Sequence, residues 1–488
     1  MWYGVSSIAA RLINYLLTPF LTYTTAIKTS DYGKMALVYA AIPLLNVLFT
    51  YGFETAYFRF SSNEENKKTI YNTAALSLFF STILFTSILW INRETLGSVT
   101  GLSGFPQIIQ LSIFIIALDT LTTIPFARLR QEGRPVKFAA AKIIGILINV
   151  FLTWFFIGYC SQQVSKNPDS WVSLFYDPSN NPIYYVVLAN LVQAVVTLLF
   201  LSKEIAAIRF KFDTRLWKQM MIYSLPLIVA GMGGMSNETF DRLMLKWWLP
   251  RDADSQIGIY NACYKLSILI TLFIQAFRMG AEPFFFKQAE GKSPQKVYAR
   301  VMKFFVIVIT VMFLGVSLFM PVWKNFIGPK YWAGLSVVPI LLLANMFLGI
   351  YYNLSVWYKL GNKTMAGAWI TLLGTAITII INYLFIPKYG YTACAWATFL
   401  CYGSMMVASF AWGQKEYPVP YAWKKLVAYI VIVVLLFFIH KGIANLWKND
   451  VFSLAVAALL TSLYLWFVGQ VEKKELPQLP LIGKYFRK

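Results

Sequence analysis

The segment KKLVAYIVIVVLLFFIHK, residues 424–441, indicates the class of fold to which this chain belongs. Its charged residues stand at the two ends, and the residues between them are almost all apolar. The whole segment has 18 residues, and a transmembrane α-helix needs about 20 predominantly apolar residues, with a range of roughly 17–25. The segment is therefore predicted to be a transmembrane helix.

Thirteen other runs along the chain share this character, and the overall composition agrees with them. Hydrophobic residues make up 58% of the 488 residues and charged residues only 13%, whereas soluble proteins carry about 25% charged residues. We therefore predict an all-α integral membrane protein with about 14 transmembrane helices. They lie near residues 2–23, 35–58, 70–91, 106–127, 138–159, 182–202, 218–240, 256–278, 301–321, 333–357, 364–386, 391–412, 424–441 and 450–469.

The net charge of +22 is distributed unequally between the two sides of the predicted membrane. Loops on the side of the two termini carry most of the loop Lys and Arg residues, as in KEIAAIRFKFDTRLWK, residues 203–218. Cytoplasmic loops are enriched in Lys and Arg. We expect a multi-pass membrane protein with both termini in the cytoplasm, and we attribute the basic excess to topology rather than to nucleic-acid binding.

A weak internal repeat divides the predicted helices into two sets. Ser30, Gly33 and Tyr39 recur in the same order as Ser255, Gly258 and Tyr264. A unit of six helices brings the chain back to its starting side, so the two copies would be related by a pseudo-twofold axis along the membrane normal. The predicted parts are a bundle of six helices in residues 1–210, a second in 211–413, and two added helices with a tail in 414–488. Two like bundles facing a cleft favour transport by alternating access.

Polar residues follow one face of several predicted helices and make a positively charged lumen the favoured hypothesis. Ionisable groups inside a bilayer are costly and usually face a cavity or a partner. Arginine forks match phosphate oxygens, and a cationic cleft attracts anions. The candidate substrate-binding residues are Arg11, Asn14, Arg59, Asn261, Lys265, Gln275 and Arg278.

Acidic residues leave alternatives open for some of these cations. Glu54 or Asp119 could pair with Arg11 as a structural ion pair, and Asp119 could instead carry a proton or a sodium ion. For Arg242, a structural pair with Asp241 or with Glu238, one helical turn away, is the favoured interpretation.

Little in the sequence indicates a cofactor or a metal. The chain has one histidine, and its four cysteines are too far apart for a CxxC cluster. No GxxxxGK[ST] loop is present, so we expect coupling to a proton or sodium gradient or to the membrane potential rather than to a nucleotide.

Four stretches resemble a known family. YGVSSIAARLINYLLTPFLT, TYGFETAYFRF, IPFARLRQEGRPVKFAAAK and the DR of NETFDRLML are similar to the O-antigen flippases (Wzx type) of the multidrug/oligosaccharidyl-lipid/polysaccharide (MOP) exporter superfamily. The resemblance implies that an undecaprenyl-pyrophosphate-linked oligosaccharide is moved from the cytoplasmic to the periplasmic leaflet of the bacterial inner membrane. It also implies membrane lipid, a polysaccharide polymerase and other assembly proteins as partners. The head group would then be engaged by Arg11, Arg59, Lys265 and Arg278.

Three other functions are weighed against this one. A multidrug or cation antiporter of the same superfamily would need an acidic pocket, and the cations within the spans argue against it. A flippase for the peptidoglycan lipid precursor would share the cationic lumen. A membrane-embedded glycan polymerase, ligase or acyltransferase is disfavoured because no nucleophile with an adjacent base is visible and His440 lacks an evident companion. We therefore expect a transporter rather than an enzyme.

Overall fold

A computed structural model describes residues 2–61, 67–289, 293–361, 363–447 and 449–475, and throughout these ranges the ordered elements are helices. The long helices are α1 (Trp2–Tyr23), α2 (Thr29–Thr50), α4 (Lys67–Ile91), α6 (Pro106–Gln131), α7 (Pro135–Thr153), α9 (Pro182–Phe200), α11 (Thr214–Trp248), α12 (Ala253–Gln288), α13 (Pro294–Ser317), α15 (Val338–Leu354), α17 (Thr364–Tyr389), α18 (Tyr391–Glu416), α19 (Trp423–Leu446) and α20 (Asp450–Val471). Shorter helices join them, namely α3 (Phe53–Phe60), α5 (Arg93–Thr100), α8 (Ser161–Lys166), α10 (Ser202–Ala206), α14 (Met320–Trp323) and α16 (Val356–Leu360).

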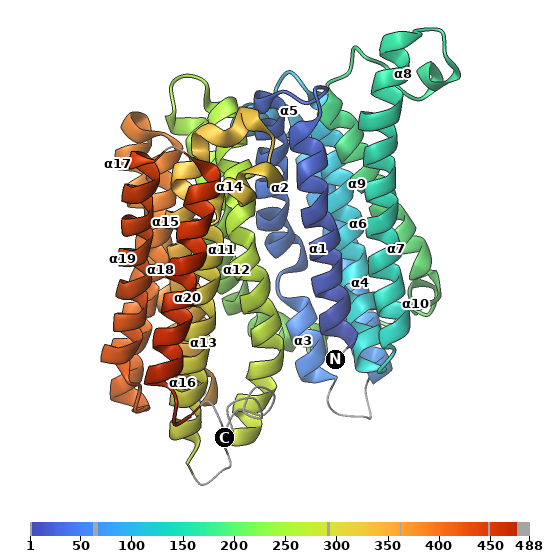
Figure 1. The fold of residues 1–488 in the computed structure, drawn as a ribbon. Helices are drawn as coiled ribbons and strands as arrows, with labels where there is room; N and C mark the ends of the chain where they lie inside the picture. The colour runs from blue at the N-terminus through green and yellow to red at the C-terminus, as the bar shows by residue number, and fades with distance from the viewer. Residues whose placement is uncertain (1, 62–66, 290–292, 362, 448, 476–488) are drawn as a thin grey trace.

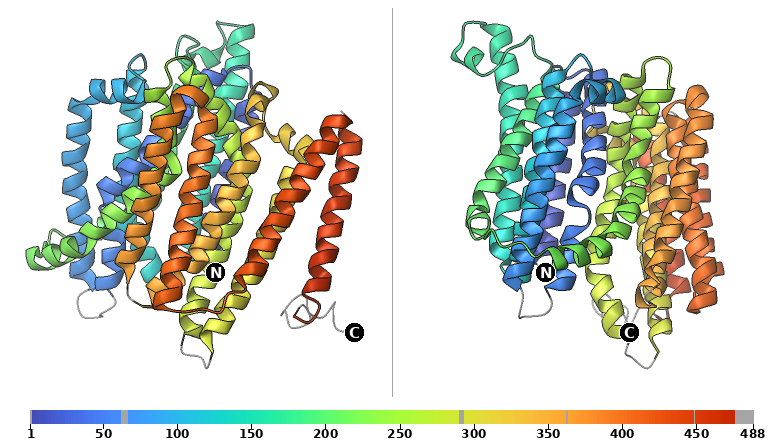
Figure 2. Two further views of the ribbon diagram at one scale, coloured as in Figure 1. Left: turned by 90° about the vertical axis from the view of Figure 1, so that its left-hand side faces the viewer. Right: turned by 180° about the vertical axis from the view of Figure 1, so that it is seen from behind.

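Most of the long helices stand side by side with their axes roughly parallel, as Figure 1 shows. Helices α1 to α9 lie on one side of the molecule and α11 to α20 on the other (Figure 1). Helix α1 begins and α20 ends at the same end of the bundle, which we call the terminus end, and the opposite end is the far end. In Figure 2, α19 and α20 form one edge, where both contact α13.

Each predicted transmembrane run falls mainly on helical residues of the structure. Twelve helices or continuous helical stretches there are long and apolar enough to cross a membrane. The predicted runs at 2–23 and 218–240 fall on α1 and α11, which lie outside those twelve. The protein is thus a multi-pass helical membrane protein, while the count of fourteen spans stays a prediction.

The second predicted run, 35–58, is wrong as a single helix. The helix begins earlier, at Thr29, and breaks between α2 and α3, where Tyr51 and Gly52 both adopt left-handed backbone conformations with φ of 32° and 72°. Glycine takes this conformation without steric cost, which explains its place at the break. As a result, Glu54 lies on a different helix from Tyr39.

At the far end, α2 and α12 cross with their backbones in close contact. A Cβ atom on Gly33 would overlap the backbone oxygen of Asp254, and a Cβ atom on Gly258 would overlap the backbone oxygen of Thr29. The two contacts are reciprocal, because each glycine meets the residue four positions before the other glycine. Only glycine permits so close an approach of two helices. The repeated glycines of the sequence therefore join the two sides of the molecule at this crossing.

Large apolar side chains cover the outside of the bundle. Among them are Leu199, Phe438 and Trp466, each at least 60% exposed. A soluble monomer rarely exposes extensive apolar surface, so these side chains belong in lipid. Ion pairs close the terminus end instead, as where Lys303 of α13 meets the buried Glu472 at 2.9 Å and attaches α20 to the bundle.

Candidate substrate cavity

A polar cavity of about 500 Å³ lies among the helices. Its walls combine hydroxyl and amide side chains with three cations, Arg11, Lys142 and Lys265, and one carboxylate, Asp119. The lining residues are Arg11, Asn14, Leu17, Thr18, Leu21, Tyr32, Met35, Tyr39, Asp119, Thr122, Phe126, Lys142, Ile146, Asn149, Val186, Asn190, Gln193, Thr197, Asn261 and Lys265. The excess of cations makes this cavity suited to an anionic group.

The cavity lies almost entirely on the N-terminal side of the molecule. Its wall is built by α1, α2, α6, α7 and α9, and the other side contributes only Asn261 and Lys265 of α12. The two sides of the molecule therefore contribute unequally to this cavity, and α11 does not line it. The physical reason is that α11 packs its polar groups against α17, α18 and α12 instead.

Lys265 is the cation that α12 brings to this wall. It is half-buried, and within the described residues it has no carboxylate partner. Asn261 lies one turn earlier on the same face of α12 and also lines the cavity. An ammonium group held in a water-accessible cavity without a counter-charge is available to an anionic ligand.

Arg11 lines the cavity and crosses from α1 to α12. Its Nη1 donates a hydrogen bond to Oε1 of Gln275. Asn14, one turn further along α1, also lines the cavity, whereas Gln275 contacts Arg11 without lining it. Neither acidic partner suggested by the sequence forms an ion pair with Arg11 in the described residues, so this guanidinium keeps its charge uncompensated.

Lys142 is a cavity cation that the sequence analysis missed as a binding residue. It lies in α7, and its Nζ stands 4.6 Å from the ring centroid of Phe126. The sequence did contain a signal, because Lys142 falls inside the predicted span 138–159 and not in a loop. Asn190 was missed as well, and it donates a 3.1 Å hydrogen bond to the hydroxyl of Tyr39 across the cavity wall.

Arg242 forms the structural pair that the sequence favoured. Its Nη1 lies 2.9 Å from Oδ1 of Asp241, and both residues are more than 90% buried. Tyr260 donates to the other carboxylate oxygen at 2.7 Å, and the guanidinium lies 4.6 Å from the ring centroid of Tyr264. Glu238 takes part through its backbone oxygen and not through its carboxylate. The pair is sealed within the protein and does not line the cavity.

Three other predicted residues lie outside the cavity lining. Arg59 stacks over Tyr223 at 4.4 Å, and Arg278 over Tyr352 at 3.9 Å from the ring centroid. Glu54 forms an ion pair with Arg130, which corrects the proposed pair with Arg11.

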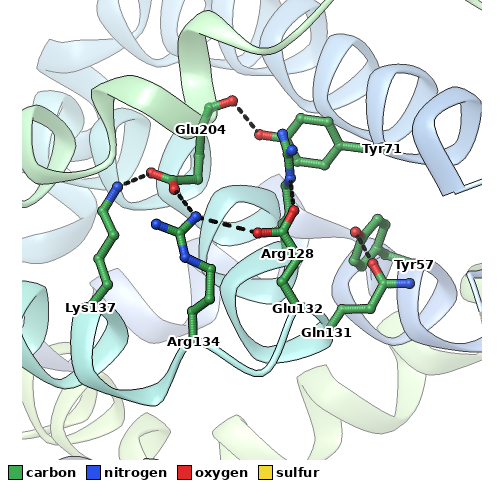
Figure 3. Close-up of polar contacts among 8 residues, drawn as sticks. All are labelled: Tyr57, Tyr71, Arg128, Gln131, Glu132, Arg134, Lys137 and Glu204. Carbon is green, nitrogen blue, oxygen red and sulfur yellow. Dashed lines mark hydrogen bonds and ion pairs between the residues drawn. The ribbon is translucent and has the colours of Figure 1, made fainter.

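The basic loop between α6 and α7 is held by a polar network, which Figure 3 shows. Buried Glu204 of α10 accepts from Arg134 at 2.9 Å and from Lys137 at 2.5 Å, as Figure 3 shows. Arg128 donates to Glu132 at 2.6 Å. Partial burial alone would raise the pKa of Glu132, but the hydrogen bonds and charges of Arg128 and Arg134 outweigh it and place that pKa below its usual value. These cations stabilise the fold.

Known proteins share the family profile and the helical fold of this chain. The sequence profile of a family described as polysaccharide biosynthesis protein matches residues 1–289. The structure of the lipid II flippase MurJ in an inward closed conformation aligns with a TM-score of 0.72 and 10% identity, over 96% of this chain and 98% of that one. A multidrug resistance MATE family transporter of the MOP superfamily, inward-facing, aligns with a TM-score of 0.65 and 13% identity, over 88% and 95%. A structure of a multidrug resistance MATE family transporter of the MOP superfamily in an outward-facing conformation aligns with a TM-score of 0.60 and 13% identity over the same shares. No curated protein matches the sequence.

Proposed function

Because the chain belongs to the polysaccharide biosynthesis protein family of the MOP superfamily and is a membrane flippase of that type, we propose that its cargo is an undecaprenyl-pyrophosphate-linked oligosaccharide. The glycan would be a repeat unit of O-antigen or of another surface polysaccharide. The lipid would move from the cytoplasmic to the periplasmic leaflet of the bacterial inner membrane.

The observation that carries this proposal is the cationic lining of the cavity. Arg11, Lys142 and Lys265 converge on it from α1, α7 and α12, against the single carboxylate of Asp119. A pyrophosphate group is a multiply charged anion and cannot enter hydrocarbon without losing its hydration. Charged and hydrogen-bonding side chains in the cavity would replace that water, as Arg and Lys do at other phosphate sites.

The sugars of the cargo fit the remaining lining. Asn14, Asn149, Asn190 and Gln193 present amides, and Thr122 presents a hydroxyl. Amides both donate and accept hydrogen bonds, which matches the hydroxyl groups of an oligosaccharide. The same lining is unsuited to a drug or cation antiporter, because the cations of the cavity repel a positively charged cargo.

Movement would follow from separating the two sides of the molecule at one end at a time. In this structure the far end is held by the crossing of α2 and α12 at Gly33 and Gly258. With the termini in the cytoplasm, that end is periplasmic, so the cavity would load from the cytoplasm in this conformation. Asp119 is the carboxylate in the lining that could take up a coupling proton or sodium ion.

Reconstitution tests the function directly. Purified protein in liposomes should move a fluorescent undecaprenyl-pyrophosphate oligosaccharide between leaflets without nucleotide, since the sequence has no phosphate-binding loop. Deletion of the gene should leave the corresponding lipid-linked oligosaccharide in the inner leaflet. Accumulation of the peptidoglycan precursor instead would assign the chain to that other lipid, and strict dependence on ATP would rule out a secondary carrier.

A further inference from the structure

A second hollow, separate from the cavity, runs along the outside of the bundle between α2, α4 and the first turns of α11. Its volume is about 620 Å³. The residues along it, which we call the α4 groove, are Leu45, Leu48, Phe49, Tyr51, Ser77, Phe80, Ser81, Leu84, Phe85, Ile88, Leu89, Phe212, Trp217, Met221 and Ile228. It opens on the lipid-facing surface, where Phe80 and Leu84 are more than half exposed.

The few polar atoms of the α4 groove are occupied by one another. The hydroxyl groups of Tyr51 and Ser77 lie 2.6 Å apart, and the indole nitrogen of Trp217 donates to Ser77 at 2.8 Å. Ser81 donates to the Tyr51 hydroxyl at 3.2 Å. Because these polar groups already have hydrogen-bond partners, they need none from a ligand, and the groove offers it an apolar wall. Such a wall suits a hydrocarbon chain.

The length and position of the α4 groove distinguish an acyl chain of a phospholipid from a longer polyprenyl chain. Its lining on α4 runs from Ser77 to Leu89, which is about 18 Å of helix. One leaflet supplies only about 15 Å, half of the hydrocarbon thickness. Because α4 begins at Lys67 and the lining ends at Leu89, about 33 Å further along the helix, a chain with its head at the terminus end must pass the midplane to fill the groove. An acyl chain of a phospholipid ends near the midplane, so the groove favours a longer chain, such as a polyprenyl chain.

A basic segment lies at the terminus end of the α4 groove. The backbone nitrogen of Arg209 donates to Asn72, and that of Asp213 donates to Thr73, which fixes the segment on α4 one turn before the groove begins. The same segment supplies Phe212 and Trp217 to the groove. Its exposed cations, which form no ion pair within the described residues, are Arg209, Lys211, Arg215 and Lys218.

This combination of an apolar groove and a basic rim has the two-part chemistry of a lipid with a phosphorylated head. Phe210, 85% exposed beside the cations, is suited to the membrane interface, where aromatic and basic side chains meet lipid head groups. The distance from rim to groove is short because Phe212 and Trp217 belong to both. A phosphate at the rim and a chain in the groove can therefore be bound together.

We propose that the α4 groove and its basic rim are a loading site, where a polyprenyl diphosphate lipid binds with its chain along α4 before its head enters the cavity. This inference rests on the proposed function, because it takes the cargo to be such a lipid. The site lies on the outer surface between α4 and α11 and uses none of the cavity cations.

Two tryptophan substitutions on adjacent residues of α4 test the proposal. Leu84→Trp fills the groove, whereas Ile83→Trp places the same side chain on a neighbouring exposed position outside the lining. Purified variants in nanodiscs of phosphatidylcholine would be titrated with a long-chain polyprenyl diphosphate and with geranyl diphosphate, whose chain is too short to span the groove. Thermal unfolding of both variants controls for folding.

We expect Leu84→Trp to weaken binding of the long-chain diphosphate about tenfold while geranyl diphosphate binding and Ile83→Trp stay near wild type. A photoreactive group near the end of the long chain should label α4 between residues 77 and 89. Equal affinities of the two variants would overturn the loading site alone, provided that wild type still flips lipid. Competition by phosphatidylglycerol as strong as by the polyprenyl lipid would overturn the choice of occupant. Failure of wild type to bind or flip any polyprenyl diphosphate would instead remove the proposed function.

Discussion

Lys265 of α12 and Arg242 of α11 are both cations within the membrane-spanning part of the chain, yet their surroundings are opposite. Arg242 is 6% exposed and shares Asp241 with Tyr260. Lys265 faces a polar cavity with Arg11 and Lys142 as fellow cations. The first arrangement compensates a charge inside the protein, and the second leaves charges ready for a ligand. An intramembrane cation therefore indicates function only when its counter-charge is missing.

The largest effect is expected for Arg242, whose replacement should lower the free energy of unfolding. Arg242→Leu leaves Asp241 buried without its partner, which costs about 3–5 kcal/mol in the free energy of unfolding. Thermal unfolding of the purified protein would show this loss. The double variant Asp241→Asn with Arg242→Leu removes both charges and keeps an acceptor for Tyr260, so it should recover most of the stability. A stable single variant would contradict the structural role.

Lys265→Ala should have the reverse effect, with folding retained and transport lost. Removing this ammonium group leaves no buried carboxylate without a partner, so the midpoint of thermal unfolding should change little. A charged hydrogen bond to phosphate contributes about 1.5–3 kcal/mol, so affinity for a polyprenyl diphosphate should fall roughly 10- to 100-fold. Lys265→Arg keeps the charge and serves as the control. Wild-type affinity in Lys265→Ala would remove the cation from the binding site.

The crossing of α2 and α12 at the far end controls how accessible the cavity around Lys265 is from that end. Gly33→Val cannot fit against Asp254, so α2 and α12 should separate there. We expect an Asn261→Cys reporter to be labelled about tenfold faster by a membrane-impermeant thiol reagent, a shift of about 1.4 kcal/mol toward the open state. The four native cysteines are buried. Gly315→Val is the matched control, because its Cβ would meet open space. Unchanged labelling would show that the crossing is not a gate.

The smallest effect is expected at the solvent-exposed pair of Glu132 with Arg128. Because the pKa of Glu132 is lowered in the folded protein, its contribution to stability is present above the usual glutamate pKa of about 4.3 and is lost as pH falls through the lower folded value. Glu132→Gln should cost less than about 1 kcal/mol at neutral pH. Its stability difference from wild type should shrink below pH 4 or so, as thermal unfolding across pH would reveal. A difference that grows on acidification would contradict this assignment.

The candidate site could be read only in part from the sequence. Helical period placed Arg11, Asn14, Asn261 and Lys265 on polar faces, and all four line the cavity. The same reasoning could not separate Arg59 and Arg278 from them, because a helical phase gives the face of a helix but not the neighbour that the face meets. Both stack on tyrosines of distant segments.

The break after α2 shows a second limit. A hydrophobic run continues through Tyr51 and Gly52, so composition predicts one helix, whereas two left-handed residues end it. Glu54 then turns toward Arg130, a partner far away in sequence. Lys142 was missed for a different reason, because its position within a predicted span could have identified it as a cation that needs a cavity or a partner.

The sequence by itself determined the solvent and the class of fold, because apolar runs of membrane length and the distribution of loop charges are local properties of the chain. It also placed the repeated glycines, Gly33 and Gly258. Only the tertiary structure decided that these glycines meet, that the cavity lies almost wholly on one side of the molecule, and that Arg242 is sealed while Lys265 is open. Those outcomes depend on which helix faces are in contact, and contacts between distant segments are set by packing and charge compensation across the whole bundle.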